Sequence, residues 1–205
     1  MKTIILFISL FVYADKYTET MTKNIETVYN NSSREEIQKA VNTFERIGNA
    51  EKTKWEPYYY ASFGNIMMAV REQDGAKKDA LLDLAKTAID KAGAIKPDES
   101  EIVTLDGFIH MIRVSVDPAS RGQKYSTLAM QSYGKALGLN PENPRALALM
   151  AQLQFGTAKF FKQEPTEACQ TANKALALFD AKPFELTIAP SWGRGMTEEL
   201  VKGCK

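Results

Sequence analysis

Histidine is almost absent from this chain of 205 residues, because His110 is the only one. A serine–histidine triad would depend on that single side chain, and a metal site built from several histidines is excluded. The sequence also lacks the motifs H-E-x-x-H, G-x-S-x-G, G-x-x-x-x-G-K and G-x-G-x-x-G, which mark common hydrolytic and nucleotide-binding sites. We therefore expect a protein that is not an enzyme, with no catalytic residue, no metal site and no cofactor.

A surplus of either charge is lacking as well. The chain carries 26 lysine and arginine residues against 25 aspartate and glutamate residues, a formal net charge of +1. Such a balance creates no long-range field that would draw in nucleic acid or an anionic membrane. Beyond the N-terminal region, no stretch is long and apolar enough to cross a bilayer. We therefore expect no nucleic-acid partner and no integral membrane segment.

The first 14 residues have the pattern of a secretory signal peptide. Lys2 provides a positive start, residues 4–12 are apolar apart from one serine, and Ala14 is a small residue before Asp15. The run is too short for a transmembrane helix, and no cysteine follows it to carry a lipid anchor. A first amphipathic helix is the alternative, but the run offers no polar face. We predict export, to the periplasm or as a secreted protein, and a single mature domain of residues 15–205.

Cysteine occurs only twice, as Cys169 and Cys204. In an exported chain an even number of cysteines suggests a disulfide. The bridge would tie the C-terminal segment to the last repeat and stabilise the fold by about 3–4 kcal/mol in the chain-entropy description. Two unpaired thiols are the alternative. Neither cysteine has a C-x2-C neighbour, so this pair is a disulfide candidate and not part of a metal site.

What the sequence does contain is a spaced signature of small residues that occurs three times. Alanines two helical turns apart let a neighbouring helix approach closely, the residue between them (bulky in two copies) fills the gap, and a proline ends the helix. A unit that buries its apolar face only by stacking on its neighbours makes a solenoid, and solenoids usually bind rather than catalyse. The copies are Ala85-x3-Ile89-x2-Ala92 before Pro97, Ala129-x3-Tyr133-x2-Ala136 before Pro141, and Ala168-x3-Ala172-x2-Ala175 before Pro183.

Each signature follows a stretch that suits a partner helix. In Tyr60-x2-Phe63-Gly64-x2-Met67, the glycine between bulky residues lets two helices cross closely. No run alternates apolar and polar residues as a strand would. We predict an all-α protein, an α-α superhelix of about three to four helix hairpins followed by a C-terminal capping helix. The expected hairpins span residues 16–50, 57–97, 100–141 and 144–183, and the cap spans residues 191–205.

Helix starts agree with this division. Ser33-x-x-Glu36 and Asp98-x-x-Glu101 are candidate capping boxes. In a capping box, the side chain of the first residue accepts from the backbone amide of the fourth, and the side chain of the fourth accepts from the backbone amide of the first. Asn143, which precedes a proline, is a good N-cap for the third hairpin.

The spacing resembles the tetratricopeptide repeat (TPR), whose signature is W-x2-L-G-x2-Y, then A-x3-F, then a closing proline. The resemblance is strongest over residues 57–141. Three further stretches are Phe44-Glu45-Arg46-Ile47, Trp55-Glu56-Pro57-Tyr58-Tyr59-Tyr60 and Ser120-Arg121-Gly122-Gln123-Lys124-Tyr125. With these stretches the chain resembles a group of exported tetratricopeptide proteins of uncharacterised function in Bacteroidetes-type bacteria. The resemblance implies a TPR-like solenoid and an exported protein, and it implies no activity.

The chain departs from that repeat in its period. Successive signatures begin at Ala85, Ala129 and Ala168, which are 44 and 39 residues apart, where the family unit has about 34. We expect the excess to form loops between the two helices of each hairpin. Insertions at equivalent places emerge on one edge of a solenoid. The expected loops are residues 71–79, 114–125 and 157–165.

The concave groove is the first candidate binding surface, because solenoid curvature places one stripe of each leading helix on the inner face. The stripe leans apolar, which suits an amphipathic helix or an extended apolar segment of a partner. The alternative is that the N-terminal helix, or the tail over residues 184–192, fills the groove itself. The stripe is predicted to contain Tyr58, Asn65, Met68, Thr104, Phe108, Met111, Arg145, Gln152 and Phe155, with Ala61, Glu101 and Ala148 beside them.

The inserted edge is the second candidate. Arg121, Lys124 and Tyr125 fall in the middle loop, and Trp192 and Arg194 fall in the C-terminal linker. An anionic group or an acidic partner loop would bind there by charge-assisted hydrogen bonds. The alternative is a set of solvated loop charges, since surface pairs contribute little.

The sole histidine needs no functional explanation. His110 occupies a position that the repeat usually gives to an aromatic residue, so we interpret it as a packed neutral imidazole. Together these features predict a non-catalytic scaffold or adaptor of the cell envelope, a monomer that binds a protein or peptide partner. The alternative is a structural subunit of a self-associating or larger envelope assembly.

Overall fold

The computed structural model describes the backbone of residues 4–30, 32–182 and 184–204, and the side chains from Lys16 onward within those ranges. These ranges contain nine α-helices and no strand, which confirms the predicted all-α fold. None of the helices is both long and apolar enough to cross a membrane. The helices are α1 (Ile4–Tyr29), α2 (Arg34–Ala50), α3 (Glu56–Arg71), α4 (Gly75–Ile95), α5 (Ser100–Val114), α6 (Pro118–Leu139), α7 (Pro144–Phe160), α8 (Thr166–Asp180) and α9 (Arg194–Lys202).

The side chains of the predicted signal peptide, residues 1–14, lie outside the described part of the chain. Residues 1–3 are not described, and α1 begins at Ile4 and continues past the expected cleavage position to Tyr29. Cleavage after Ala14 therefore stays a prediction.

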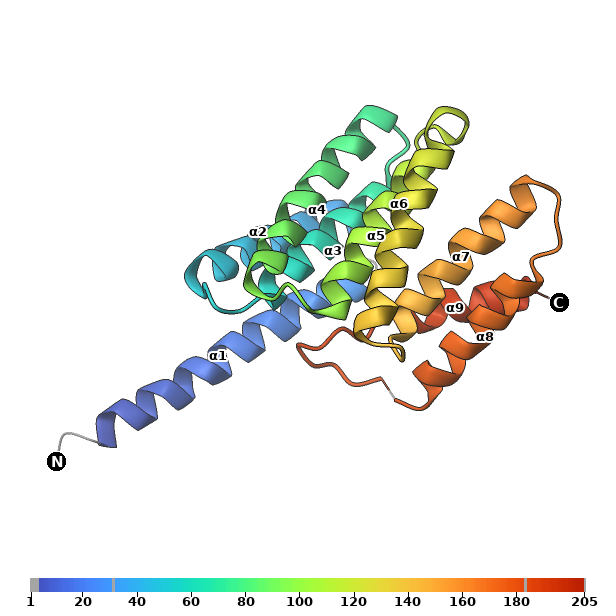
Figure 1. The fold of residues 1–205 in the computed structure, drawn as a ribbon. Coiled ribbons are helices and arrows are strands. Elements are labelled where there is room, and N and C mark those ends of the chain that lie inside the picture. Colours follow the sequence, from blue (N-terminus) through green and yellow to red (C-terminus); the bar gives the residue numbers. More distant parts are fainter. Residues whose placement is uncertain (1–3, 31, 183, 205) are drawn as a thin grey trace.

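Consecutive helices form antiparallel pairs that stack side by side into a superhelix (Figure 1). α3 packs on α4, α5 on α6 and α7 on α8. The leading helices also contact one another, α3 with α5 and α5 with α7, so they form one continuous layer. α1 and α2 pack on α3 at one end of the stack, and α9 packs on α8 at the other. The predicted α-α superhelix with a C-terminal capping helix is confirmed.

The repeated signature has the role that its spacing predicts. All nine of its residues are buried, so α4, α6 and α8 each turn a flat stripe of small side chains toward the leading helix of their hairpin. In the middle hairpin, the ring of Tyr133 on α6 lies directly over Gly107 on α5. Small side chains at these contacts are the reason that the helix pairs approach closely.

Side-chain caps fix where several helices begin. At Ser33 the capping box is complete, with the Glu36 amide 3.3 Å from the serine Oγ and the Ser33 amide donating to the Glu36 carboxylate at 2.9 Å. The expected box at Asp98 does not form, because α5 starts at Ser100 with Glu99 as its N-cap. The side chain of Glu101 is instead bonded to Arg145, and it is not available to complete that box.

Asn143 both starts α7 and ties it to α5. Its Oδ1 accepts hydrogen bonds from the amides of Arg145 and Ala146, each at 3.0 Å. Its Nδ2 donates to the hydroxyls of Ser100 at 2.8 Å and Thr104 at 3.3 Å. Because Asn143 is fully buried, each of these bonds satisfies a polar group that would otherwise be costly to bury. The register between two hairpins is therefore set by a polar contact as well as by apolar packing.

The expected insertion loops are wrong for the first two hairpins, because the extra residues lengthen the helices. The connections that remain are residues 72–74 and 115–117, each ending in an aspartate that caps the next helix. The Asp74 carboxylate accepts from the Lys77 amide at 2.9 Å, and the Asp117 carboxylate accepts from the Ser120 amide at 3.2 Å. These caps start α4 and α6 early, so most of the expected loop is helical. Of the three expected loops, the longest that remains is the one after α7, over residues 161–165.

We expect Gly107→Ala to destabilise the fold by about 1–3 kcal/mol, because a Cβ there would lie 2.5 Å from Cε1 of the buried Tyr133 ring. Gly134→Ala on α6 is the matched control, since no atom lies within 4 Å of its Cβ position. An alanine at that helical site is expected to leave stability unchanged or raise it by up to about 1 kcal/mol. Urea unfolding followed by far-UV circular dichroism measures both, and equal midpoints for the two variants would contradict the close α5–α6 contact.

Candidate functional site

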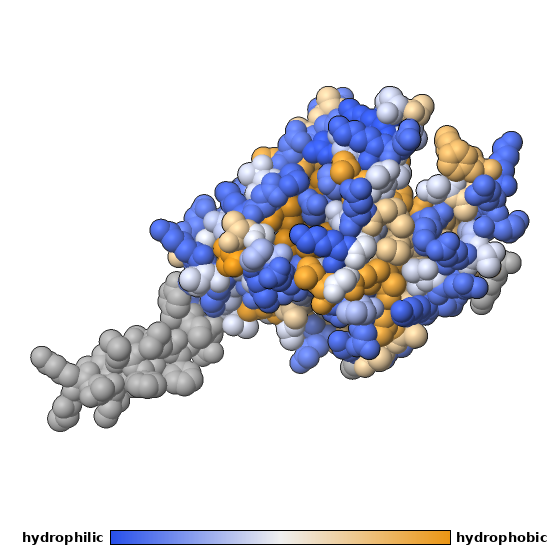
Figure 2. Space-filling model, in the orientation of Figure 1, coloured by the Kyte–Doolittle hydropathy of each residue, from blue (hydrophilic) through white to orange (hydrophobic). Residues whose placement is uncertain are grey.

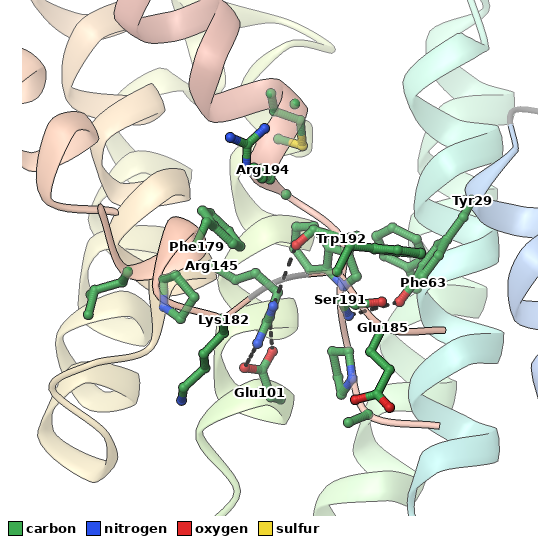
Figure 3. Close-up of a pocket in the computed structure, with 18 of the residues that line it drawn as sticks. Tyr29, Phe63, Glu101, Arg145, Phe179, Lys182, Glu185, Ser191, Trp192 and Arg194 are labelled. Atoms are coloured by element: carbon green, nitrogen blue, oxygen red, sulfur yellow. Dashed lines mark hydrogen bonds and ion pairs between the residues drawn. The ribbon is translucent and has the colours of Figure 1, made fainter. Parts of the chain in front are cut away.

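The chain between α8 and α9 crosses the layer formed by α3, α5 and α7, and we call it the strap (described residues 181–182 and 184–193; Figure 3). Near its end, the indole of Trp192 lies between the rings of Phe63 and Phe108 and is only 8% exposed. The ring centroids are 4.8 Å and 5.8 Å away, and the ring planes are tilted by 24° and 21°. Stacked rings stabilise each other beyond the area they bury. The strap therefore fills the centre of the groove.

A closed circuit of hydrogen bonds surrounds this indole. Trp192 Nε1 donates to the Tyr59 hydroxyl at 2.9 Å, and that hydroxyl donates to Glu101 at 3.5 Å. Arg145 donates to both oxygens of Glu101, each at 2.7 Å, and its Nη1 also reaches the Trp192 carbonyl at 3.5 Å. Figure 3 shows Arg145 between the carboxylate and the strap. One residue of the strap is thus bonded through both its side chain and its backbone to α3, α5 and α7.

Two tyrosine hydroxyls hold the rest of the strap. Tyr60 donates to the Ile188 carbonyl at 3.0 Å, and the Ser191 amide donates to the hydroxyl of Tyr29 at 3.2 Å. The hydroxyls of Tyr29 and Tyr60 are 3.2 Å apart and bond to each other. The strap is therefore fixed to the end of α1 and to α3 as well.

The titration behaviour of these groups favours a fixed charge pattern. Burial alone would lower the pKa of Arg145, but the hydrogen bonds and the charge of Glu101 outweigh it, so the net pKa of the guanidinium is raised. Burial is the main reason that the pKa values of Tyr59 and Tyr60 lie well above 10. Arg145 therefore remains charged, and the two phenols remain neutral donors, across the physiological pH range.

The strap is anchored at its C-terminal end by a disulfide and a glycine. Cys169 on α8 and Cys204 after α9 are bonded, with Cα atoms 5.8 Å apart, so α9 cannot move away from α8. Gly193 joins the strap to α9 with φ of 109°, and a Cβ there would lie 2.9 Å from Phe179 Cζ. That backbone conformation and that space both require glycine.

A cleft of about 620 Å³ lies beside the strap. Its floor and walls come from the strap itself, the end of α1, and α3, α7, α8 and α9. Figure 3 places Phe179 and Lys182 on one side of Trp192 and Tyr29 and Phe63 on the other. The apolar part of the lining includes Tyr29, Phe63, Met67, Phe179, Phe184 and Met196.

The cations at this cleft differ in how far they are already engaged. Arg194 pairs with Asp180 at 2.7 Å and with a second carboxylate on α9. Arg71 donates to the Ser32 carbonyl at 2.7 Å. Within the described residues, the ammonium group of Lys182 has no ion-pair or hydrogen-bond partner, and Figure 3 shows its side chain extended. Lys182 is therefore the cation most available to an anionic ligand.

The structure places most of the expected groove residues in the core. Six of the nine are buried, for example Phe108 under Trp192 of the strap, Tyr58 against Gly48 of α2 and Met111 against Tyr133 of α6. Arg145 lines the cleft, whereas Gln152 is exposed and Phe155 lies half-buried near Gly203, which follows α9. Of the two alternatives for the groove, the structure therefore supports the one in which the tail fills it, and a cleft lies beside the tail. The buried six are Tyr58, Asn65, Met68, Thr104, Phe108 and Met111.

The expected binding edge is divided in two. Trp192 and Arg194 lie at the cleft, but Arg121, Lys124 and Tyr125 lie on α6 and line no part of it. The last three belong to a helix and not to a flexible loop, which corrects the expectation.

The residues on α6 have their own structural partners. Arg121 is bonded to both oxygens of Asp79, at 2.9 Å and 2.7 Å. The ring of Tyr125 stacks on His110 with centroids 6.0 Å apart. Burial lowers the pKa of His110, although the charge of Asp106 opposes the shift. A neutral, packed imidazole fits these contacts. Across the described chain, no group of three or more His, Cys, Asp or Glu residues is placed to hold a metal ion.

The sequence does not predict the hydrogen-bond circuit around the indole of Trp192, although it contains one signal for part of that circuit. Glu101 and Arg145 occupy equivalent positions of consecutive leading helices, and both fell in the expected inner stripe. Opposite charges at equivalent positions of neighbouring repeats indicate an ion pair between hairpins. The role of Tyr59 and Trp192 had no comparable signal, because they are 133 positions apart.

We expect Arg145→Met to destabilise the protein by about 3–5 kcal/mol, because it leaves the Glu101 carboxylate buried without its partner. Glu101→Gln combined with Arg145→Met should recover much of that loss, since the carboxamide carries no charge. Urea unfolding of the four proteins in this double-mutant cycle measures the coupling.

The matched control is Lys202→Met, which removes an ion pair with Glu199 that is exposed on both sides. It should have no measurable effect on the unfolding midpoint. If Arg145→Met behaved like this control, the pair would not be the buried link described above.

Comparisons with known proteins give one informative result. No family model matches the chain, and no curated protein matches it either. Among solved structures, the chain is similar to the HusA haemophore from Porphyromonas gingivalis. The two share 28% sequence identity with a TM-score of 0.80, and the similarity covers 91% of this chain and 92% of the haemophore.

Proposed function

We propose that this protein is an exported, non-catalytic carrier that binds haem or a closely related tetrapyrrole in the cleft beside the strap. The observation that carries the proposal is the similarity to a haemophore, a haem-binding carrier, over nearly the whole of both chains. An identity of 28% at this coverage exceeds a likeness of fold alone, so a shared class of ligand is a reasonable inference. The protein would thus still be a non-catalytic binding protein, as the sequence predicts, but its partner would be a small ligand and not a protein or peptide.

The size and lining of the cleft suit a flat, largely apolar ring. Its volume of about 620 Å³ falls within the range of small-molecule sites. Aromatic side chains supply flat apolar surface, and the thioethers of Met67 and Met196 adapt to an irregular outline. A tetrapyrrole would bury its ring against these groups and leave its polar edge toward the solvent.

One charge at the mouth, that of Lys182, suits the carboxylates of such a ligand, whereas Glu142 and Glu185 of the same lining would repel them. Lys182 is the unengaged cation of the lining, and a charge-assisted hydrogen bond from it to a carboxylate would fix the orientation of the ring. Arg145 is less suited, because both oxygens of Glu101 already occupy its guanidinium. The recognition of the acidic edge is therefore assigned to Lys182.

A histidine ligand to iron is not part of this proposal. His110 packs against Tyr125 on α6 and is not among the residues that line the cleft. The side chains that line the cleft include only weak ligands for iron, such as the thioethers of Met67 and Met196. The hydroxyl of Tyr29 also lines the cleft, but it is already bonded to Tyr60 and to the strap. Burial of the ring and recognition of its carboxylates therefore supply most of the binding free energy in this proposal. A metal-free porphyrin should for that reason bind with an affinity near that of haem.

An adaptor that binds a protein or peptide is the second candidate. That hypothesis needs an open concave groove, and the strap already fills the centre of the groove. The six buried residues of the predicted groove stripe have almost no solvent-exposed surface that a partner helix could contact. We therefore rank small-ligand binding above it. The alternative of a self-associating envelope subunit has no feature of the described chain that favours it.

Titration with haem and with protoporphyrin tests the proposal. In a Trp55→Phe background, Trp192 is the only remaining tryptophan, so its emission reports on the strap alone. We expect both ligands to quench that emission and to saturate at one ligand per chain. Lys182→Glu should weaken binding by about tenfold, because the ligand carboxylate then meets a like charge.

Lys135→Glu is the control, since it makes the same charge change on an exposed face of α6 away from the cleft. It should leave the affinity unaltered. A failure of both ligands to saturate would overturn the proposed function. Equal losses for the two lysine variants would instead show that binding, although real, lies outside the cleft.

A further inference from the structure

The turn between α7 and α8 exposes two adjacent phenylalanines. Phe160 is 67% exposed and Phe161 is 63% exposed, and their rings pack edge to face with centroids 5.1 Å apart. We call residues 159–163 the hairpin tip. In Figure 1 this end of the α7–α8 pair projects away from the neighbouring α6, and in Figure 2 a hydrophobic projection bordered by hydrophilic side chains stands out there. Water is a poor environment for two such rings, so the position calls for an explanation.

The backbone holds the two rings at the end of the hairpin. The Gln163 amide donates to the Ala158 carbonyl at 2.8 Å, and the Lys162 amide donates to the Lys159 carbonyl at 3.2 Å. Lys162 has φ of 55°, the left-handed conformation in which a helix end usually places glycine. A lysine adopts this conformation at an energetic cost. Lys162 therefore places a cation at a position where glycine would adopt the left-handed conformation without that energetic cost.

Cations lie on both sides of the aromatic pair. Lys159 precedes it and Lys162 follows it, and in the described chain neither side chain is in an ion pair; Lys159 lies over the Phe155 ring at 5.3 Å. Glu164 and Glu167 follow in the sequence, but no acidic residue lies within residues 159–163, so the tip itself carries a positive local charge. The net charge of the chain is nearly zero, but this local charge acts within the screening length of about 10 Å.

We propose that the hairpin tip is a membrane anchor, which inserts Phe160 and Phe161 into the headgroup region of an anionic lipid surface. Aromatic rings favour that region, and lysine side chains can extend from it toward phosphate groups. The proposal does not rest on haem binding, because no residue of the tip lines the cleft.

The shape of the tip favours a membrane over a protein partner. Stable protein interfaces bury roughly 800 Å² on each side and centre their aromatic residues in a surrounding patch. The tip instead offers two rings at the end of a convex turn, with lysines in place of an apolar surround. Two rings and two cations give weak, reversible attachment, as expected of an interfacial anchor without lipidation.

Vesicle flotation tests the proposal, with the protein recovered after export from an expressing bacterium. Its N-terminus is first determined by mass spectrometry, because the apolar run of residues 4–12 would itself bind lipid if retained. We expect binding to mixed phosphatidylcholine and phosphatidylglycerol vesicles, and at least about tenfold weaker binding to phosphatidylcholine alone. Phe160→Ser with Phe161→Ser should lower binding to the anionic vesicles by about tenfold or more, and so should Lys159→Glu with Lys162→Glu.

Two control variants make the same kinds of substitution as the tip variants, at exposed positions outside the hairpin tip. Leu84→Ser removes an exposed apolar side chain of α4, and Lys77→Glu with Lys135→Glu reverses two exposed lysines. Both should bind vesicles like the unaltered protein, and circular dichroism should show the same helicity throughout. The proposal is overturned if the unaltered protein stays unbound to anionic vesicles, or if the two tip variants float as well as their controls.

Discussion

Glu101 and Arg145 face each other across the contact between α5 and α7, and both side chains are almost buried. Charges removed from water are tolerated only when they are paired and fully hydrogen-bonded, and here both oxygens of the carboxylate accept from the guanidinium. The same pair bonds to Tyr59 and to the backbone of Trp192, so it links two hairpins to the strap. The contact between these two hairpins and the path of the strap across it both depend on this interaction.

The strap explains why a solenoid of this length has no open groove. A repeat array exposes the inner stripe of its leading helices, and that surface must be covered by a partner or by the chain itself. Here Trp192 fills the centre, and the disulfide between Cys169 and Cys204 keeps α9, to which the strap is joined, against α8. Because the strap covers the centre, the remaining cavity is displaced to its flank, where strap residues form part of the lining.

The helices and their pairing were predictable from the sequence because both depend on local periodicity. Ala85 and Ala92, for example, lie on one side of a helix whatever the rest of the chain does. The expected loops were wrong because the distance between repeats gives a number of residues and not their conformation, and the caps at Asp74 and Asp117 made the extra residues helical. The sequence does not decide whether the strap fills the groove, because the contacts of the strap join residues that are distant in the sequence and no period specifies them.

Under the proposed function, selectivity at the cleft would come from the placement of its cations and not from net charge. Arg145 and Arg194 are as cationic as Lys182, yet each already has a carboxylate within hydrogen-bonding distance, so an incoming anion would have to compete with a partner that is part of the protein. Lys182 has no such competitor among the described residues. A ligand with one apolar face and an acidic edge can therefore satisfy the aromatic wall and this single cation together. A purely anionic ligand gains only one contact, and a purely apolar ligand leaves Lys182 without a partner.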